Sequence, residues 1–410
     1  MAIPSPFHAR TSALCRSLRW KDWSGYHAVC AYDTYPDREY YAIRHTAGLI
    51  DVTPLYKYEV TGPDAAAFLA HLMVKDIRKL KLGQVTYCCW CDDHGKLLDD
   101  GTCSRLDENH FRVTAAEPSL AWFTRNAATY DVHIDDSTER IAAVALQGPS
   151  SRDILARVAD ADVQGLRFFR LTETRIDGFN AVITRTGYTG DLGYEVWIDN
   201  VHAMKLWDTL IDAGKPFGML PIGLDAIDIA RVEAGFIMNG VDYYSANHCL
   251  IESRKSTPYE AGLGWTVNLD RERSTDLGRG STDPGSAFIG QAAIRREKQT
   301  GPVRGFVGLD LDWDEFERLH ALHRLPPQVP AAAWRSAVPV YSDRGKHIGQ
   351  ATSGVWSPTL KKNLALATIK APYSAIGTLV RMEVTVEYVR HTIPAVVSNR
   401  PFFDPPRKRA

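Results

Sequence analysis

Four aspartates surround a short Gly-Lys turn in the stretch CCWCDDHGKLLDDGTC, which reads as a β-hairpin. Asp92 and Asp93 precede the turn, and Asp99 and Asp100 follow it. Because strand side chains alternate between faces, Asp99 and Asp100 point to opposite faces and one of them can face inward. A buried carboxylate can stabilise a developing cation or accept a proton. Spacing alone nevertheless favours four solvated hairpin residues.

A second acidic residue, Glu195, leaves the glycine-rich stretch TRTGYTGDLGYEVWI of residues 184–198. Its carboxylate is either solvated or forms the floor of a pocket. Farther on, the sequence GLDAIDIARVEAGF after Pro221 predicts a helix. In that helix Asp228 and Arg231 stand at i,i+3 and can pair. Arg231 can also bind a ligand carboxylate through two hydrogen bonds, but the sequence alone favours the intrahelical pair.

Cys88, Cys89 and Cys91, with His94, raise the question of a zinc site. The spacing C-C-x-C without a second paired cluster is a poor match to zinc sites, and buried thiols are the better interpretation. We therefore predict no metal. The chain shows no P-loop, nucleophile elbow or G-x-G-x-x-G after a strand.

The elements that carry these residues follow a repeated pattern. Tyr56, Tyr58 and Val60 alternate as in a half-buried strand, and a Gly-Pro-Asp break leads into a helix over residues 65–73. The stretch IAAVALQGPSSRDILARV repeats the order strand, Gly-Pro, helix, which indicates two related α/β halves. Residues 270–288 read as an exposed insertion. Short alternating runs beyond them predict an antiparallel barrel or sandwich, and the basic, Pro-rich end predicts an extended tail.

The bulk composition narrows the class of protein. The chain has 410 residues, 45% hydrophobic and 24% charged, with a net charge of −1. Two or three domains are expected, and a near-neutral chain gives no reason to expect a nucleic-acid or membrane partner. The odd cysteine count and the lack of an export signal or membrane span favour a cytoplasmic location, with a mitochondrial one if the chain is eukaryotic.

Several motifs occur here in one order: GLIDVTPL, TGPDA, LLDDG, RTGYTGDLGYEVWI, LDAIDIARVEAG, YEAGLGWTVNLD, FIGQAA and TSGVWSPTLKKNLALA. Together they resemble the folate-dependent aminomethyltransferase family, the glycine cleavage T-protein and its relatives, over residues 41–403. The resemblance implies an α+β fold with two α/β domains and a C-terminal antiparallel β-barrel around a central funnel for tetrahydrofolate. The expected domains span residues 1–140, 141–290 and 300–410.

The resemblance also implies roles for individual residues. Glu195 takes the place of the glutamate that binds the pterin ring, and a carboxylate suits adjacent N–H donors. Asp100, with its neighbour Asp99, takes the place of the acid beside folate N5, where it orients N5 and steadies positive charge. The remaining expected folate-site residues match family positions: Tyr87, Tyr188, Arg231 and Arg335.

The chain departs from the glycine-cleavage enzyme at positions expected near the funnel. It reads DVTPL in place of DVSHM, HGKLLDD in place of GGIxDD, and it carries Ile227 where the family has an arginine. Residues 271–287 look inserted. These departures favour a one-carbon donor other than the lipoyl-bound aminomethyl group, since losing a guanidinium changes which anions the wall can hold.

Three functions stay open from the sequence. The first is a tetrahydrofolate-dependent aminomethyl or methyl transferase, which takes a small-molecule donor or, in glycine cleavage, a lipoyl carrier protein. The second is a stand-alone demethylase of a methylated amine, sulfonium compound or aryl methyl ether, among which Asp100 favours an amine. The third is a non-enzymatic folate-binding protein, but the KGCYxGQE stretch of such relatives is absent. A domain of a flavin-dependent amine oxidase lacks support, because no dinucleotide fingerprint precedes it.

Overall fold

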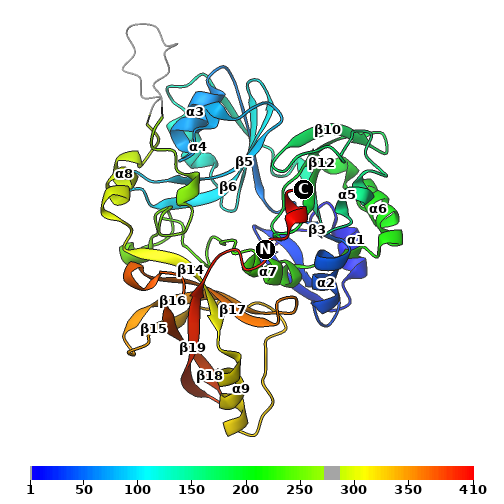
Figure 1. The fold of residues 1–410 in the computed structure, drawn as a ribbon. Helices are drawn as coiled ribbons and strands as arrows, with labels where there is room; N and C mark the ends of the chain where they lie inside the picture. Colours follow the sequence, from blue (N-terminus) through cyan, green and yellow to red (C-terminus); the bar gives the residue numbers. More distant parts are fainter. Residues whose placement is uncertain (1, 272–286) are drawn as a thin grey trace.

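The computed structural model describes residues 2–271 and 287–410 of the chain. Three β-structures dominate it: a five-stranded sheet, a six-stranded sheet and a closed six-stranded barrel. In Figure 1 the two sheets lie side by side above the barrel. The predicted insertion at residues 270–288 falls almost entirely outside the described residues.

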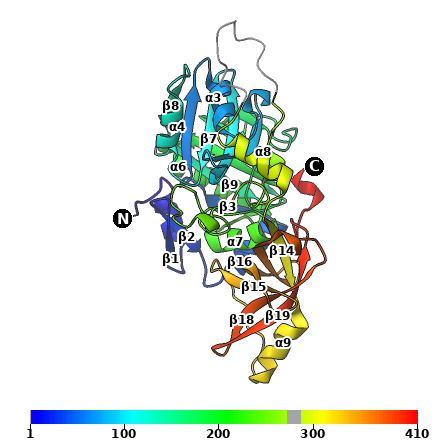
Figure 2. The same ribbon diagram turned by 90° about the vertical axis from the view of Figure 1, so that its left-hand side faces the viewer.

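The five-stranded sheet carries the predicted hairpin, and each of its strand pairs is antiparallel. Its order is β5-β6-β7-β4-β8, with β4 (Tyr56–Thr61), β5 (Val85–Cys91), β6 (Leu97–Asp107), β7 (His110–Ala115) and β8 (His133–Asp136). The accompanying helices are α3 (Ala65–Leu72), α4 (Leu120–Asn126) and α8 (Gln291–Thr300). Figure 2 shows α8 beside this unit. The predicted strand, Gly-Pro break and helix are confirmed by β4 and α3.

The six-stranded sheet has the order β10-β11-β12-β9-β3-β13, and β13 pairs with β3 in the parallel sense. Its strands are β3 (Gly48–Asp51), β9 (Ile141–Gln147), β10 (Leu171–Ile176), β11 (Phe179–Thr184), β12 (Gly193–Asp199) and β13 (Leu220–Pro221). The helices of this unit are α1 (His8–Leu14), α2 (Asp37–His45), α5 (Ser151–Leu155), α6 (Ala203–Gly214) and α7 (Leu224–Glu233). A small ribbon of β1 (Arg19–Trp23) and β2 (Tyr26–Ala31) adjoins α7. The second predicted strand, Gly-Pro, helix unit is confirmed by β9 and α5.

The two α/β units interleave in sequence. β3 comes from the N-terminal part of the chain but pairs with β9 in the six-stranded sheet. Phe7, Ala47 and Leu49 likewise belong to the core of that unit. The expected ranges 1–140 and 141–290 stay a prediction about domains, but the sheets do not follow a boundary at residue 140.

The C-terminal antiparallel barrel is confirmed, with the closed order β14-β17-β16-β15-β18-β19. Its strands are β14 (Arg304–Leu311), β15 (Val338–Ser342), β16 (His347–Ser357), β17 (Lys362–Lys370), β18 (Leu379–Val386) and β19 (Val389–Ser398), with α9 (Trp313–Leu322). Alternate side chains such as Leu309, Ile369 and Ile393 fill its interior. Short 3₁₀ helices complete the list: η1 (Ile77–Lys79), η2 (Asn200–His202), η3 (Lys215–Phe217), η4 (Glu252–Arg254), η5 (Gly264–Thr266), η7 (Ala371–Tyr373) and η8 (Pro406–Lys408).

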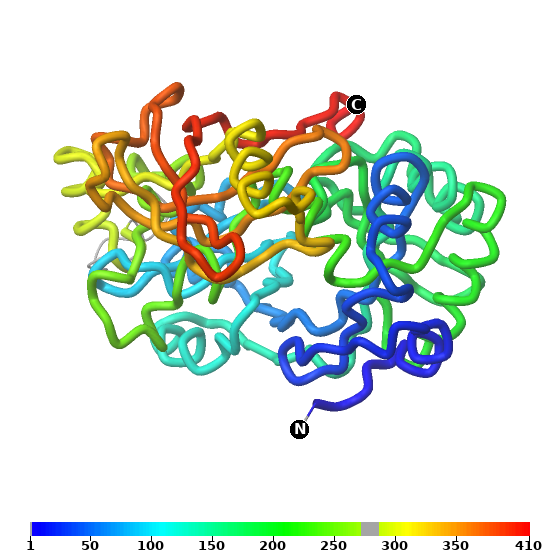
Figure 3. Tube along the Cα trace, turned by 90° about the horizontal axis from the view of Figure 1, so that it is seen from below, coloured from blue at the N-terminus to red at the C-terminus, as the bar shows by residue number. Residues whose placement is uncertain are grey.

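The chain end differs from the predicted extended tail. Viewed from below, it runs from the barrel back to the six-stranded unit (Figure 3). The backbone N–H groups of Phe402 and Phe403 each donate to the Glu233 carbonyl at 2.9 Å. Lys408 is only 8% exposed. The basic, Pro-rich sequence suggested a free tail, but Arg407 pairs with the buried Asp191 of the glycine-rich turn, and Arg409 pairs with Asp404 within the segment itself.

A buried carboxylate pair as the candidate active site

Asp99 and Asp100 stand on β6, opposite Trp90 and Cys89 of β5. Asp92 shapes the turn of this hairpin, because its Oδ1 accepts the N–H groups of His94 and Lys96 at 2.9 and 2.8 Å. The solvated interpretation therefore fits Asp93, which is exposed, but not Asp99, which is 1% exposed. Gly101 follows the pair, and a Cβ there would lie 1.9 Å from the Thr114 carbonyl oxygen. Only glycine allows β6 to approach β7 so closely directly after the two acids.

The two carboxyl groups have different partners. Oδ2 of Asp99 accepts the backbone N–H groups of Ala116 and Glu117 at 2.9 and 2.8 Å, and Oδ1 accepts Nδ2 of Asn239 at 2.9 Å. Asp100, which is half-buried, accepts the Tyr87 hydroxyl at 2.6 Å on Oδ2 and the Tyr243 hydroxyl on Oδ1. No cation contacts either carboxyl group among the hydrogen bonds and ion pairs of the described residues.

Burial raises the pKa of both carboxyl groups above the ordinary range of aspartate. For Asp99 the charge of Asp100 adds to the effect, and the N–H donors oppose it. For Asp100 the two tyrosine hydroxyls lower the pKa again. Two adjacent buried acids cannot both ionise cheaply, so the pair titrates as a unit.

Two pairs of stacked aromatic rings belong to the surroundings of the acids. Tyr87 stacks on Trp265 with ring centroids 5.8 Å apart and an interplanar angle of 17°. Trp265 is 65% exposed although it stacks on the half-buried Tyr87, and so large an exposed aromatic surface is unusual. Tyr188, from the glycine-rich turn, stacks on Phe236 at 5.6 Å and donates to the Ile237 carbonyl. Ile237 stands two residues before Asn239, which binds Asp99, so the Tyr188 ring lies near the acids. Burial raises the pKa of Tyr188.

Glu195 stands on β12, where the glycine-rich turn re-enters the sheet. Its Oε2 accepts the Thr186 hydroxyl at 2.6 Å and the Thr184 hydroxyl at 3.4 Å. Oε1 has no hydrogen bond to any residue in the described part of the chain. Burial raises the pKa of Glu195, and the two threonine hydroxyls lower it. This carboxylate is half-buried, fixed on one side and available on the other.

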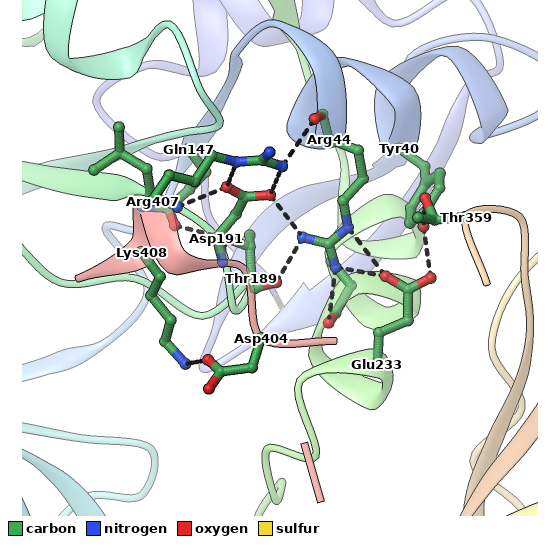
Figure 4. Close-up of polar contacts among 12 residues, drawn as sticks. Tyr40, Arg44, Gln147, Thr189, Asp191, Glu233, Thr359, Asp404, Arg407 and Lys408 are labelled. Carbon is green, nitrogen blue, oxygen red and sulfur yellow. Dashed lines mark hydrogen bonds and ion pairs between the residues drawn. The ribbon is translucent and has the colours of Figure 1, made fainter. Parts of the chain in front are cut away.

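A network of buried charged side chains contacts the glycine-rich turn of residues 187–193 (Figure 4). Nη1 of Arg44 donates to the Thr189 carbonyl at 2.9 Å and lies 3.4 Å from Asp191, whose carboxylate also accepts Arg407 at 2.7 and 2.8 Å. Arg44 also binds Glu233. At Gly190, with φ of +72°, a Cβ would lie 2.5 Å from the Ala234 Cβ. The turn can therefore pack on the end of α7 only with glycine at this position.

The two predicted arginines do not line the acid pair. Arg231 is fully buried and donates to Asp228 at 2.7 Å, Asp242 at 2.7 Å and Ser353 at 2.8 Å. These contacts favour the intrahelical pair, extended into a network, over a direct ligand contact. Nε of Arg335 donates to Asp228 at 2.6 Å, and its side chain is 25% exposed. Both arginines tie α7 to the barrel.

The structure brings Asp99, Asp100, Tyr87 and Tyr188 together and adds three residues that the sequence analysis missed: Asn239, Tyr243 and Trp265. Asn239 and Tyr243 follow α7 in a segment without periodicity, so no local pattern marks them. Trp265 lies inside the motif YEAGLGWTVNLD, and an aromatic residue in a glycine-rich segment could have indicated a binding surface.

The three neighbouring cysteines are buried thiols. Cys88 packs in the core of the five-stranded unit, and Cys89 and Cys91 pack in the core that also contains residues of α7 and the barrel. Burial raises the pKa of Cys88 to about 12.

This donor set suits a flat ring with N–H groups on its edge. The free Oε1 of Glu195 can accept such groups, and the exposed face of Trp265 offers a stacking surface. The acid pair can take up a proton or face a developing positive charge.

Among the described residues no group of His, Cys, Asp or Glu is arranged to hold a metal ion. None of the described helices is long and apolar enough to cross a membrane.

Comparisons with known proteins agree with this architecture. Residues 10–271 match the GCVT N-terminal domain, and residues 318–404 match the glycine cleavage T-protein C-terminal barrel domain. The chain is 34% identical to an aminomethyltransferase of Bacillus subtilis over 371 residues, 89% of this chain and 90% of the relative. It is 33% identical to an aminomethyltransferase of Caldanaerobacter subterraneus over 370 residues, 89% of this chain and 87% of the relative.

Two further matches differ in kind. A trimethylamine-oxide aldolase of Ruegeria pomeroyi is 32% identical over 393 residues, which cover 93% of this chain but 45% of that protein. The crystal structure of the glycine cleavage system aminomethyltransferase T from Bartonella henselae superposes with a TM-score of 0.79 at 24% identity, over 98% of this chain and 99% of that one. The family matches span both the α/β region and the barrel, and this chain therefore belongs to the glycine cleavage T-protein (GCVT) family.

Proposed function

We propose that the protein transfers a one-carbon unit from a donor to N5 of tetrahydrofolate, with Asp100 as the acid nearest the reacting nitrogen. The observation that carries this proposal is the Asp99–Asp100 pair on β6, whose partners among the described residues are hydroxyl and N–H donors without a cation. Such a pair lacks a bound counter-charge, so a substrate that develops positive charge is stabilised beside it.

Glu195, Tyr87 and Tyr188 are proposed to hold the folate. The free carboxylate oxygen of Glu195 accepts N–H donors from the pterin edge, and Trp265 adds an aromatic face next to Tyr87. Tyr87 has a second role, because its hydroxyl orients Asp100 through a 2.6 Å hydrogen bond. Arg231 and Arg335 support α7 from behind and, in this proposal, position the site without touching the ligand.

The donor is either the aminomethyl group of a lipoyl carrier protein or a free methylated compound. The aminomethyltransferase relatives support the first donor, and the trimethylamine-oxide aldolase relative supports the second, with a methylated amine oxide as the class of donor. Asp100 favours a nitrogen donor in both cases, because a carboxylate suits an iminium-like carbon and an ammonium leaving group.

A donor panel tests the proposal. The purified protein is incubated with tetrahydrofolate and, in separate reactions, an aminomethyl-lipoyl carrier protein, dimethylglycine, trimethylamine oxide, a dimethylsulfonium acid or a methoxyarene. The expected result is 5,10-methylene-tetrahydrofolate from the aminomethyl-lipoyl carrier protein, whose carbon is already at the formaldehyde level, or from trimethylamine oxide, whose N–O bond is reduced as one methyl carbon is oxidised. The methyl groups of dimethylglycine stay at the methanol level without an oxidant, so transfer from this donor gives 5-methyl-tetrahydrofolate. Formation of 5-methyl-tetrahydrofolate from the sulfonium acid or the methoxyarene would instead assign methyl transfer. A panel without any product, from protein that binds tetrahydrofolate, would contradict the proposed reaction.

A further inference from the structure

The hydroxyl of Tyr243 lies between the two carboxyl groups of the acid pair. It donates to Oδ1 of Asp100 and lies 3.4 Å from Oδ1 of Asp99. Tyr243 is 2% exposed, on the segment that follows α7, so the protein encloses this hydroxyl. A phenol has one proton and cannot donate to both acids at once. The second contact becomes a hydrogen bond only when one of the carboxyl groups carries a proton itself.

The other partners of Asp99 allow it to carry that proton. Its Oδ2 accepts two backbone N–H groups, and its Oδ1 accepts the amide of Asn239. A proton on Oδ1 keeps all three bonds and points at the phenol oxygen. Within the described ranges, the partners of the Asp100 carboxyl group are two hydroxyls, from Tyr87 and Tyr243. Hydroxyl groups can turn from donor to acceptor, so Asp100 is satisfied with or without a proton.

We propose that Asp99, Tyr243 and Asp100 form a reversible hydrogen-bonded chain that holds one acidic proton, with Tyr243 as the link. In one arrangement the Asp99 carboxyl donates to the phenol oxygen and the phenol donates to ionised Asp100. In the other, the Asp100 carboxyl donates to the phenol oxygen and the phenol donates to ionised Asp99. In the interconversion the proton of the Asp99 carboxyl moves to the phenol oxygen, and the phenol proton moves to Asp100. Each transfer breaks one O–H bond and forms one, so the negative charge moves from Asp100 to Asp99 without any other reactant. The use of this chain in one-carbon transfer rests on the proposed function, in which Asp100 is the acid nearest the reacting nitrogen.

The neighbouring side chains neither neutralise nor take over the negative charge of Asp99 and Asp100. The titratable groups facing it are Tyr87 and Cys89 of β5, Tyr188 of the glycine-rich turn, and Asp242 next to Tyr243. Burial raises the pKa of each of the three tyrosines and of the thiol, so these groups stay neutral near pH 7. Arg231 is bound to Asp242 and Asp228 at 2.7 Å and is not a partner of Asp99 or Asp100.

Tyr243→Phe tests the link, because it removes the hydroxyl and keeps the ring. Tyr244→Phe is the matched control, since its hydroxyl takes no part in the bonds that hold the pair. Two quantities are measured from pH 5 to 9: kcat/KM of one-carbon transfer, and the free energy of unfolding in urea without folate. Both are repeated for Asp99→Asn and for the double variant.

We expect Tyr243→Phe to move the acidic limb of the kcat/KM profile by about one pH unit, a tenfold change in the proton equilibrium. The pH dependence of unfolding should change with it, and Tyr244→Phe should change neither. When Asp99 is already Asn, Tyr243→Phe should shift the acidic limb of the kcat/KM profile by less than about a third of its shift in the wild type, because the second carboxyl group is gone.

If Tyr243→Phe shifted the profile equally in the wild type and in Asp99→Asn, Tyr243 would only donate to Asp100, and the proposed proton chain would be wrong. The absence of any shift would also contradict the proton chain. The unfolding measurement separates this inference from the proposed function. If the protein transfers no one-carbon unit but the unfolding cycle shows the coupling, the chain stands and the proposed reaction fails.

Discussion

At the residue scale, the partners of a carboxylate decide what it can do. Three aspartates each bind an arginine, and their charge is balanced within the folded protein: Asp228, Asp242 and Asp191. Asp100 is held by two hydroxyls, which orient it without neutralising it. A substrate that becomes positive during the reaction therefore meets a charge that is still available.

Replacing Asp100 by Asn should lower kcat of one-carbon transfer at least a hundredfold, because the amide can neither accept the proton nor balance the charge. Asp93→Asn is the control, since Asp93 is an exposed residue of the same hairpin. The measurement is product formation from tetrahydrofolate under saturating donor. Near-full activity of the Asp100 variant would remove this residue from the mechanism.

Glu195→Gln should weaken tetrahydrofolate binding about 10- to 100-fold, in line with the ~1.5–3 kcal/mol of a hydrogen bond to a charged group. The amide keeps one acceptor but loses the charge. Titration calorimetry with tetrahydrofolate gives the dissociation constant. Glu173→Gln, an exposed position on β10 of the same sheet, should bind normally. Unchanged affinity of the Glu195 variant would place the pterin elsewhere.

At the element scale, local patterns could be predicted and long-range contacts could not. The alternation of Tyr56, Tyr58 and Val60 and the Gly-Pro breaks predicted β4, α3, β9 and α5, because periodicity and turn residues act within a few positions. Tyr243 meets Asp100 across 143 positions, and Tyr40 meets Glu233 across 193. No spacing rule covers such separations, so the contacts of the C-terminal segment and those of Asn239 and Tyr243 with the acid pair could not be predicted.

The C-terminal segment stabilises the glycine-rich turn through Arg407. Arg407→Ala removes two hydrogen bonds from the fully buried carboxylate of Asp191. Among the described residues Asp191 then keeps Arg44 at 3.4 Å as its charged partner, besides the Leu192 N–H at 2.8 Å. We expect a loss of about 1–3 kcal/mol in the free energy of unfolding in urea. Arg407→Lys should recover part of it. Arg409→Ala should change stability by less than about 0.5 kcal/mol, since Arg409 is 52% exposed. Equal effects of both alanine variants would show that the segment is not held by this pair.

Lys57 gives the connection between β3 and β4 a pH-dependent stability. It is fully buried and donates to the Thr53 and Leu55 carbonyls at 2.7 and 2.6 Å, and burial lowers its pKa to about 7. The unfolded chain keeps the ordinary pKa of about 10.4. Between these values the unfolded state binds the extra proton, so this lysine adds stability as pH rises and loses it as pH falls towards 7.

Lys57→Met should therefore flatten the rise of the unfolding free energy between pH 7 and 9, by up to about 1.4 kcal/mol per pH unit. Urea titrations at three pH values measure the slope. The exposed Lys81, changed to Met, should leave it unaltered. A parallel slope in wild type and Lys57→Met would mean that the amine stays charged in the folded protein.

At the scale of the whole molecule, buried polar contacts join the barrel to the α/β units. Asp242 is the centre of these contacts: it accepts Arg231 of α7 at 2.7 Å and the Thr352 and Ser353 hydroxyls of β16 at 2.5 and 2.7 Å. Arg335, ahead of β15, binds Asp228 on the same helix. Because Asp242 also adjoins Tyr243, the barrel and the acid pair depend on one segment.

Asp242→Asn should uncouple the barrel from the rest of the protein. The side chain of Asp242 is fully buried and the new amide N–H₂ would face hydroxyl and guanidinium donors, so a loss of about 3–5 kcal/mol is expected. Calorimetry should then resolve a separate, lower transition for the barrel, whereas we expect the wild type to melt in a single transition. Asp343→Asn, in the exposed turn between β15 and β16, should leave the melting profile unchanged. A single transition at the wild-type temperature in Asp242→Asn would show that apolar packing between α7 and the barrel, rather than these charges, holds the molecule together.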